Sequence, residues 1–284
     1  MKKTIKIVAG VVAIALIGTL LFLANGLLGN PVSMALAERA ALKHIENNYP
    51  DLNLKIEKVN YGFKTGGYYA LIKSQTSIDT HFNVDISPTG KVLRDSYETD
   101  VLSGWNTYQR IDSEYRIMTD KIFEASNYPY ISHIDFGSLK MNEADKEVGA
   151  FSPDYGVILE DLELDKKYDI KRLAKSAGHI TAYIQKEEVS VEKASEVLLG
   201  LKEIFDRNDV PFYAIDLVLQ KPRNDGDGAS YEDRPELRVN DFLYSDIYGE
   251  GLGDRFMESA KALEEYYAKE DAKKHRMILE STEE

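Results

Sequence analysis

Hydrophobic and polar positions divide the chain into an uninterrupted apolar start and a long amphipathic remainder. Ile7 to Leu28 contains 22 consecutive residues without an ionisable side chain, and lysines precede it at positions 2, 3 and 6. Because a helix rises about 1.5 Å per residue, about 20 apolar residues span the ~30 Å hydrocarbon core of a bilayer. The pattern therefore predicts a transmembrane helix within residues 1–29, with the lipid bilayer as its partner.

The charges around this apolar stretch predict its orientation. Cationic flanks tend to stay in the cytoplasm, so the N-terminus is expected inside and the bulk of the chain in an extracytoplasmic location. A cleaved signal peptide is the alternative, but signal peptides have apolar regions of ~7–15 residues. Here the stretch is longer, and the small-x-small site Ala35-Leu36-Ala37 lies well past its end. We therefore predict a single-pass protein of the cell membrane.

Residues 30–125 show one amphipathic helix, a run of strands and a second helix. Asn30-Pro31 is typical of a helix start, and Pro50 ends that helix at Tyr49. Val84 lies in the clearest strand, where apolar and polar residues alternate over 78–86. The other expected elements are a strand over 52–63 with a bulge near Glu57-Lys58, strands Tyr68–Lys73 and Lys91–Asp95, and a helix with an apolar seam at Tyr108, Ile111, Tyr115, Met118 and Ile122.

Residues 126–284 mix strands and helices without a regular βαβ spacing. Asp169 and Ser190 are expected to cap helices, the first of which ends at Gly178. Strands are predicted over 131–139, 180–184, 211–219 and 237–243, and a last helix carries Phe256, Ala260, Leu263 and Tyr267. We predict an α+β fold with three parts: the segment 1–29, a first body over 30–125 and a second over 126–284.

Composition restricts the class of partner. Beyond residue 29, 32 basic and 48 acidic side chains remain, a net charge of −16. Such a body repels phosphate backbones, so nucleic acid is not expected as a partner. The chain has no cysteine, which excludes disulfides and a thioether-linked lipid anchor.

Several short motifs resemble known families. Ala40-Ala41, Tyr49-Pro50, Tyr68-Tyr69-Ala70 and the run from Phe82 to Val92 resemble the PepSY-like, cystatin-type fold. The whole layout, including the segments 95–98 and 246–248, is similar to the YfjL-like group of uncharacterised membrane-anchored proteins of Firmicutes. The resemblance implies a Gram-positive cell-surface protein and brings no activity with it.

Five motifs are candidates for chemistry, and a structural explanation is favoured for each. Gly249–Gly253 departs from the G-x-G-x-x-G spacing of phosphate loops and is better explained as a helix entry. Ser190–Lys193 and Lys64–Gly66 have the form of S-x-x-K and K-T-G but stand in the wrong order, so a helix cap and a hairpin turn explain them. The row Asp79, His81, Asn83 and Asp85 is typical of a solvated sheet face. Asn224–Gly228 with Glu232 and Asp233 fails the calcium-loop pattern.

Asp135 and Asp216 lie inside apolar strands and form the remaining candidate. A paired-carboxylate site would need them within ~5–9 Å of each other. An aspartate that hydrogen-bonds locally is the commoner arrangement. No residue is therefore assigned a catalytic, cofactor-binding or metal-binding role, and no cofactor is expected.

We expect a membrane-anchored binding or regulatory protein of unknown ligand. One alternative is a structural subunit of a cell-envelope complex, joined to an envelope protein partner through the seam Tyr108 to Ile122. The other is a hydrolase that gathers carboxylates in a pocket.

Overall fold

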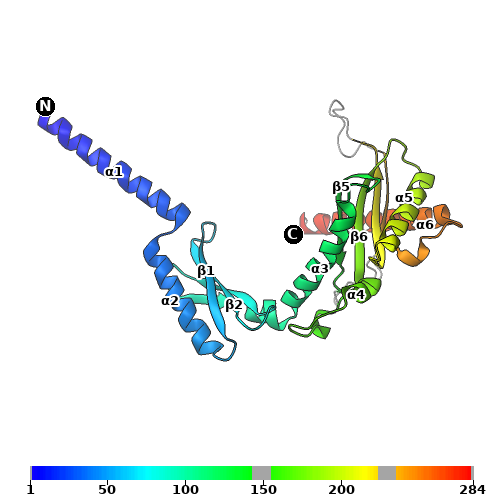
Figure 1. Ribbon diagram of the computed structural model, residues 1–284. Coiled ribbons are helices and arrows are strands. Elements are labelled where there is room, and N and C mark those ends of the chain that lie inside the picture. The colour runs from blue at the N-terminus through cyan, green and yellow to red at the C-terminus, as the bar shows by residue number, and fades with distance from the viewer. Residues whose placement is uncertain (1, 143–154, 223–234, 283–284) are drawn as a thin grey trace. The chain divides into compact units, whose positions relative to one another are not determined.

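The computed structural model describes residues 2–142, 155–222 and 235–282 and shows an α+β protein with two four-stranded sheets. The chain divides into two compact units, one formed by Met1–Thr107 with Leu162–Lys166 and the other by Tyr108–Asp161 with Lys167–Glu284. Figure 1 shows both units. The α+β class predicted from the sequence is confirmed.

The first helix, α1 (Lys2–Leu28), contains the apolar stretch, but the predicted transmembrane helix is wrong. Within the part of the chain that the structure describes, no helix combines the length and the apolar character that a membrane crossing requires. The prediction rested on 22 consecutive residues without an ionisable side chain, and a stretch without charge does not by itself establish a membrane crossing.

The first unit consists of a helix packed on an antiparallel meander. Its elements are α2 (Pro31–Asn48), β1 (Leu54–Gly62), β2 (Gly67–Ser74), β3 (His81–Ile86), β4 (Val92–Asp95) and the π-helix η1 (Glu98–Leu102), and the sheet order is β1-β2-β3-β4. The Asn30 side chain accepts a hydrogen bond from the Ser33 amide and Pro31 is the first helical residue, which confirms the predicted start of α2. The bulge is confirmed as well, because the register of β1 against β2 shifts between Ile56 and Lys58.

The third strand begins at His81 rather than at Ile78 because the residues before it form a turn. Segment Leu162–Lys166 of the chain closes this turn with a pair of reciprocal hydrogen bonds. Asp165 accepts from the Asp79 amide at 3.0 Å, and Asp79 accepts from the Asp165 amide at 2.9 Å and from the Thr107 hydroxyl at 2.8 Å. Asp79 is therefore a buried structural carboxylate.

The second unit is built on a mixed sheet in the order β5-β6-β7-β8. Strands β6 and β7 are parallel and are joined through α5, whereas both edge strands are antiparallel to their neighbours. The elements are α3 (Trp105–Phe123), whose first residues belong to the first unit, β5 (Ile131–Leu139), the 3₁₀ helix η2 (Leu159–Asp161), α4 (Ile170–Ala177), β6 (Gly178–Gln185), α5 (Val191–Arg207), β7 (Ala214–Gln220), β8 (Glu236–Leu243), the 3₁₀ helix η4 (Tyr244–Asp246) and α6 (Leu252–Thr282).

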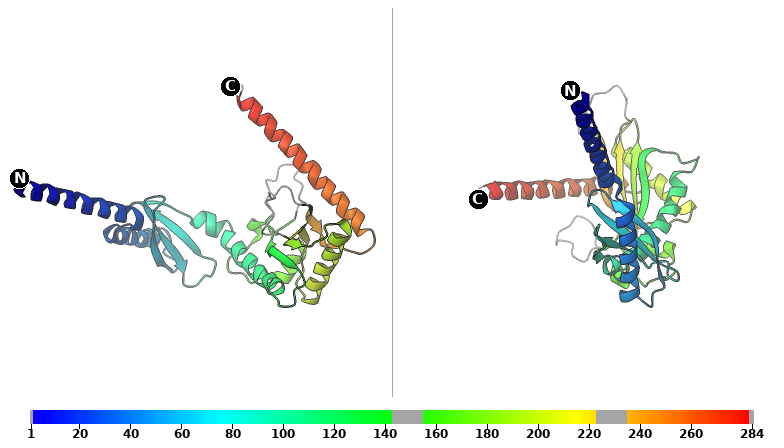
Figure 2. Two further views of the ribbon diagram at one scale, coloured as in Figure 1. Left: turned by 90° about the horizontal axis from the view of Figure 1, so that it is seen from above. Right: turned by 90° about the vertical axis from the view of Figure 1, so that its left-hand side faces the viewer.

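The core of the second unit lies between the sheet and the helices that cover it. The side chains of β6 and β7 on one face are fully buried, as are the inward residues of α5; they are Ile180, Ala182, Ile184, Ile215, Leu217, Leu219, Ala194, Leu198 and Leu201. Tyr115 of α3 is buried and donates its hydroxyl to the Pro211 carbonyl at 2.9 Å. The first turns of α6 pack through Leu252, Phe256 and Leu263, and the helix continues past the sheet (Figure 2).

Gly137 of β5 provides a stability test because α3 crosses directly over it. A Cβ at Gly137 would lie 2.4 Å from Thr119 Cγ2, and the Gly137 amide donates to Thr119 Oγ1 at 3.1 Å. We predict that Gly137→Ala lowers the free energy of unfolding by about 1–3 kcal/mol through overpacking. Urea unfolding followed by far-ultraviolet circular dichroism measures this. Thr119→Ser keeps the hydroxyl and removes Cγ2, so the double variant should recover part of the loss; equal losses in the single and double variants would contradict the packing explanation.

In the first unit, Asp95 joins the end of β4 to α2. Its carboxylate lies 2.6 Å from His44 Nε2 and accepts hydrogen bonds from the Tyr49 hydroxyl at 3.0 Å and the Tyr97 amide at 3.1 Å. Burial raises the pKa of Asp95, but the bonds from His44, Tyr97 and Tyr49 outweigh burial and hold the pKa below its usual range. Burial and the bond to Asp95 raise the pKa of Tyr49 to about 12.

This lowered pKa makes the stability of the first unit depend on pH. A carboxyl group with a lowered pKa in the folded state stabilises the fold above its unfolded pKa of about 4, and that contribution is lost as the pH falls through the folded value. We predict that the urea concentration at the midpoint of unfolding falls more steeply below about pH 4 for the wild type than for Asp95→Asn. The fluorescence of Trp105, the single tryptophan, measures the midpoint. Identical pH profiles for the two proteins would contradict the assignment.

Candidate functional site

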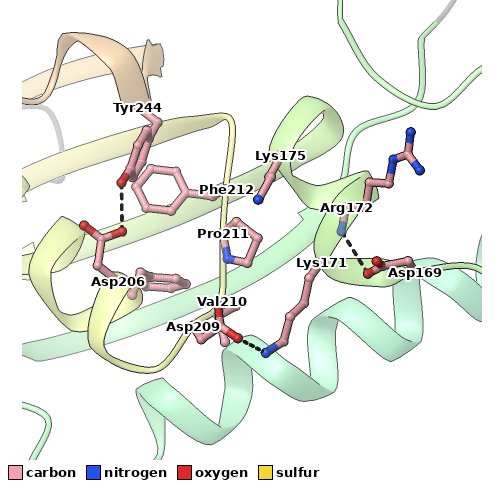
Figure 3. Close-up of a pocket in the computed structure, with 11 residues that line it drawn as sticks. Asp169, Lys171, Arg172, Lys175, Asp206, Asp209, Val210, Pro211, Phe212 and Tyr244 are labelled. Carbon is pink, nitrogen blue, oxygen red and sulfur yellow. Dashed lines mark hydrogen bonds and ion pairs between the residues drawn. The ribbon is translucent and has the colours of Figure 1, made fainter.

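A pocket of about 860 Å³ lies in the second unit where α4, the end of α5 and the entry to β7 meet. We call it the α4–α5 pocket. Figure 3 shows Lys171 and Lys175 of α4 extending toward the segment that carries Asp209 and Pro211, with Phe212 and Tyr244 on the other side. Its lining residues are Asp169, Lys171, Arg172, Lys175, Phe205, Asp206, Asp209, Val210, Pro211, Phe212 and Tyr244.

Short sequence signals explain how the chain forms the two walls of this pocket, which are α4 and the turn after α5. Asp169 caps α4 by accepting from the Arg172 amide at 3.1 Å, which fixes the first turn of that helix. At the end of α5, Asp209 adopts a left-handed conformation (φ 52°), and the Val210 amide donates to the Phe205 carbonyl at 3.1 Å. This turn reverses the chain and sends it through Pro211 into β7.

The floor of the pocket is apolar and aromatic. Phe205, Val210 and Phe212 are buried. The rings of Phe205 and Phe212 meet edge to face at 5.3 Å, and those of Phe212 and Tyr244 at 5.1 Å. Tyr244 is fixed by its hydroxyl bond to Asp206 at 2.8 Å and by Lys202, which lies 3.8 Å from the ring centre. Burial, and then Asp206, raise the pKa of Tyr244, so its hydroxyl stays neutral.

The rim of the pocket carries three acidic and three basic side chains, but they are engaged unequally. Asp169 is used by the α4 cap, Asp206 by Tyr244, and Asp209 by an ion pair with Lys171. The hydrogen bond from Lys171 lowers the pKa of Asp209. Among the described residues, Arg172 and Lys175 form no ion pair within 4 Å, although the charge of Lys175 also helps to lower the pKa of Asp209. The pocket can therefore offer two cations to a ligand above an apolar floor.

A second group of polar side chains, which we call the His179 cluster, comprises Lys140, Tyr155, His179, Asp216 and Asp241. Asp241 is buried, and its Oδ1 accepts from Lys140 Nζ and from the Tyr155 hydroxyl, each at 2.5 Å. His179 Nε2 lies 3.1 Å from Asp216 Oδ1 and 3.5 Å from Asp241 Oδ1. Burial, and then Asp241, raise the pKa of Tyr155 above its ordinary value, which keeps its hydroxyl a hydrogen-bond donor.

Positive φ angles and a register shift in the backbone place the side chains of the His179 cluster close to one another. Asp241 has φ 50° at a point where the register of β8 against β7 shifts, and its amide donates to Asp216 Oδ1 at 2.6 Å. Gly156, at φ 130°, follows Tyr155; a Cβ there would lie 2.6 Å from the Lys140 carbonyl. Only glycine fits this approach, which brings Tyr155 beside Lys140.

The structure separates Asp135 from Asp216. Asp135 is level with Ala182 and Asp216 with Thr181, so the two carboxylates face opposite sides of the sheet. Asp135 accepts from the Tyr128 hydroxyl at 2.9 Å, the Tyr183 amide at 3.0 Å and the Ser132 hydroxyl. Burial raises the pKa of Asp135, and these bonds counteract the rise.

The other sequence candidates have structural roles where they are described. In the row from position 79 to 85, Asp79 is buried in the turn before β3, whereas Asp85 pairs with Arg94 at 2.7 Å. Ser190 caps α5, and Lys64–Gly66 forms the turn between β1 and β2. Gly251, at φ 65°, precedes α6, so the glycine-rich segment is a helix entry. Asn224–Gly228, Glu232 and Asp233 lie outside the described residues.

Sequence reasoning missed both sites, apart from Asp216. The cluster joins residues as far apart as Lys140 and Asp241, which no spacing rule connects. One signal was present: His179 lies at the start of a largely apolar strand, and Asn240-Asp241 lies between Val239 and Phe242 of another. Polar residues at such positions indicate side chains that pair with one another inside the fold.

The fold and its sites define a two-unit α+β protein with a ligand-sized pocket and a buried polar cluster, both in the second unit. The chain belongs to the YfjL-like family: the model of the YfjL-like N-terminal domain matches residues 2–96, and that of the YfjL-like C-terminal domain matches residues 114–256. The resemblance seen in the sequence is thus confirmed for this family. Among curated proteins there is no match.

Two solved structures show weak similarity to the chain. A DUF5037 family protein from Ruminococcus gnavus shares 12% identity at a TM-score of 0.24, with 79% of this chain and 98% of that chain covered. A DUF1672 family protein from Staphylococcus aureus shares 11% identity at the same TM-score, with 76% and 92% covered.

Two aspartates provide a matched test of the His179 cluster. Asp241 and Asp209 both have left-handed backbone and both pair with a lysine, but their side chains are 5% and 83% exposed. We predict that Asp241→Asn lowers the free energy of unfolding by ~1.5–3 kcal/mol, because it weakens buried bonds to a charged group. Asparagine also adopts the left-handed backbone conformation, so the loss of stability measures the removal of the charge and not backbone strain. Urea unfolding should show no measurable change for Asp209→Asn; equal effects at both positions would contradict the role of burial.

Proposed function

We propose that this protein is a binding module whose α4–α5 pocket takes a small organic anion with an apolar or aromatic body. The observation that carries the proposal is the pairing of a buried aromatic floor with Lys175 and Arg172, which the rim carboxylates leave without ion pairs in the described part of the chain. A volume of about 860 Å³ suits a small molecule, since ligand pockets are commonly ~300–1,000 Å³ with few polar groups.

The two parts of the pocket make different contributions. Burial of the ligand's own apolar surface supplies most of the affinity, at about 25 cal/mol per Å², because Phe205 and Phe212 are already buried and expose little surface themselves. Lys175 and Arg172 are exposed, so salt screens their attraction for an anion and their main effect is preference for negative charge. Binding should therefore be modest for a small probe and should weaken with ionic strength.

The two alternatives to a binding role, an assembly subunit and a hydrolase, have less support. Ile111, Tyr115 and Ile122 of the α3 seam are buried within the second unit, so an assembly role through that seam has little surface to use. The hydrolase alternative loses its pair of carboxylates, because Asp135 and Asp216 face opposite sides of the sheet.

We also propose that the first unit is PepSY-like, which is supported by its helix packed on an antiparallel meander. We further propose an origin in Firmicutes and an extracytoplasmic location, and the absence of cysteine suits that location.

A pair of probes that share one aromatic body and differ in charge tests the proposal on the full chain. We predict that 2-naphthoate binds with a Kd in the millimolar range, as expected for about 0.3 kcal/mol per heavy atom, and that neutral 2-naphthylmethanol binds several-fold more weakly. Lys175→Glu should weaken naphthoate binding at least about fivefold with a smaller effect on the alcohol. Isothermal titration calorimetry and the chemical shifts of α4 and α5 amides measure this.

The control is Lys261→Glu, which makes the same charge change at an exposed residue of α6 outside the pocket. It should leave naphthoate binding unchanged. Equal binding of both probes, or equal loss in both variants, would show that the pocket does not select anions. Shifts confined to other elements would rule out the pocket itself.

A further inference from the structure

The His179 cluster contains the donor set of a metal site in addition to its ion pair. His179, Asp216 and Asp241 each offer one ligand atom, and these atoms lie within 4.8 Å of one another. One imidazole nitrogen with two carboxylate oxygens is a set that divalent first-row metals accept. The cluster is separate from the α4–α5 pocket, with which it shares no residue.

The spacing of the donors suits a single ion. His179 Nε2 lies 3.1 Å from one carboxylate oxygen and 3.5 Å from the other. Ligands bound to Zn²⁺ at ~2.0–2.2 Å in a tetrahedron are ~3.3–3.6 Å apart, so these two distances fit a shared ion. The oxygens of Asp216 and Asp241 lie within 4.8 Å of each other, so they must approach by at most about 1.5 Å. A fourth position would be left for water or a ligand.

The outer contacts of the cluster resemble those that orient metal ligands. Tyr155 donates to Asp241 at 2.5 Å, and the Asp241 amide donates to Asp216 at 2.6 Å. Such bonds fix carboxylates before a metal arrives and are a common second layer around metal sites. His179 and Asp241 are 7% exposed each, so their orientation is held by packing as well.

Lys140 provides the competing positive charge. Its ammonium lies 2.5 Å from Asp241 Oδ1, where it offsets one of the two carboxylate charges. A divalent ion would neutralise both carboxylates and would then be repelled by Lys140. The lysine must swing outward for the ion to bind, and its side chain is 25% exposed, which gives it a route to solvent.

We propose that His179, Asp216 and Asp241 form a site for a divalent transition-metal ion of the Zn²⁺ class, and that Lys140 acts as a resident cation that the metal displaces. The proposal concerns binding alone and assigns no reaction. It predicts an outcome that a purely structural ion pair does not: removing the lysine charge should improve metal binding.

The experiment measures Zn²⁺ affinity by titration calorimetry on the full chain, free of tags and treated with chelator. We predict that Lys140→Met binds Zn²⁺ at least about tenfold more tightly than the wild type. His179→Ala and Asp216→Asn, placed in the Lys140→Met background, should each lose at least about tenfold. Lys193→Met is the control, because Lys193 pairs with surface Glu196 and lies outside both sites; its affinity should equal that of the wild type.

Co²⁺ gives a second readout that does not depend on heat. Because the chain has no cysteine, cobalt bands cannot come from thiolates, and paramagnetically shifted imidazole resonances that disappear with His179→Ala would place the ion on this ring. Lys140→Met binding no tighter than the wild type, or tight binding that survives loss of His179 and of Asp216, would overturn the proposal. If Lys140→Met does not fold, Lys140→Gln replaces it, and loss of wild-type cobalt signals in Asp216→Asn decides the question.

Discussion

The parallel pairing of β6 with β7 is the constraint on which the second unit depends. Parallel neighbours cannot be joined by a hairpin, so α5 must carry the chain back along the sheet before β7 begins. Both strands therefore start at the same end of the sheet, and the segments that lead into them, after α4 and after α5, lie beside each other. That meeting of two strand entries creates the α4–α5 pocket.

The antiparallel edge strands bring the remaining residues to the same end. Leu139 is level with Gly178, so β5 finishes where β6 begins and delivers Lys140. Leu243 is level with Ala214, so β8 finishes where β7 begins and delivers Asp241 and Tyr244. Four strands thus place polar side chains at one end, and a single change of strand direction would disperse them.

Local elements could be predicted from the sequence, whereas the two sites could not. Asn30-Pro31, Asp169 and Ser190 act through neighbouring amides, so the helix starts they indicate were right. Gly178 does close its helix as predicted, but at φ −67° and not in the left-handed conformation common for glycine caps, and it leads directly into β6. The parallel pair was missed because periodicity within a strand does not encode the direction of its neighbour, and both sites follow from that pairing.

Helix ends contribute less to the field of the α4–α5 pocket than its side chains do. The N-terminus of α4 presents the positive end of a helix dipole, but Asp169 caps it with a negative charge. The C-terminus of α5 presents a negative end near Asp209, where Lys171 forms an ion pair. These opposite terms largely offset each other over the short distance at which helix ends act. Among the described residues, Lys175 and Arg172 are the rim cations without an ion pair, so the proposed preference for anions rests on two exposed side chains, while the strand topology fixes the apolar floor beneath them.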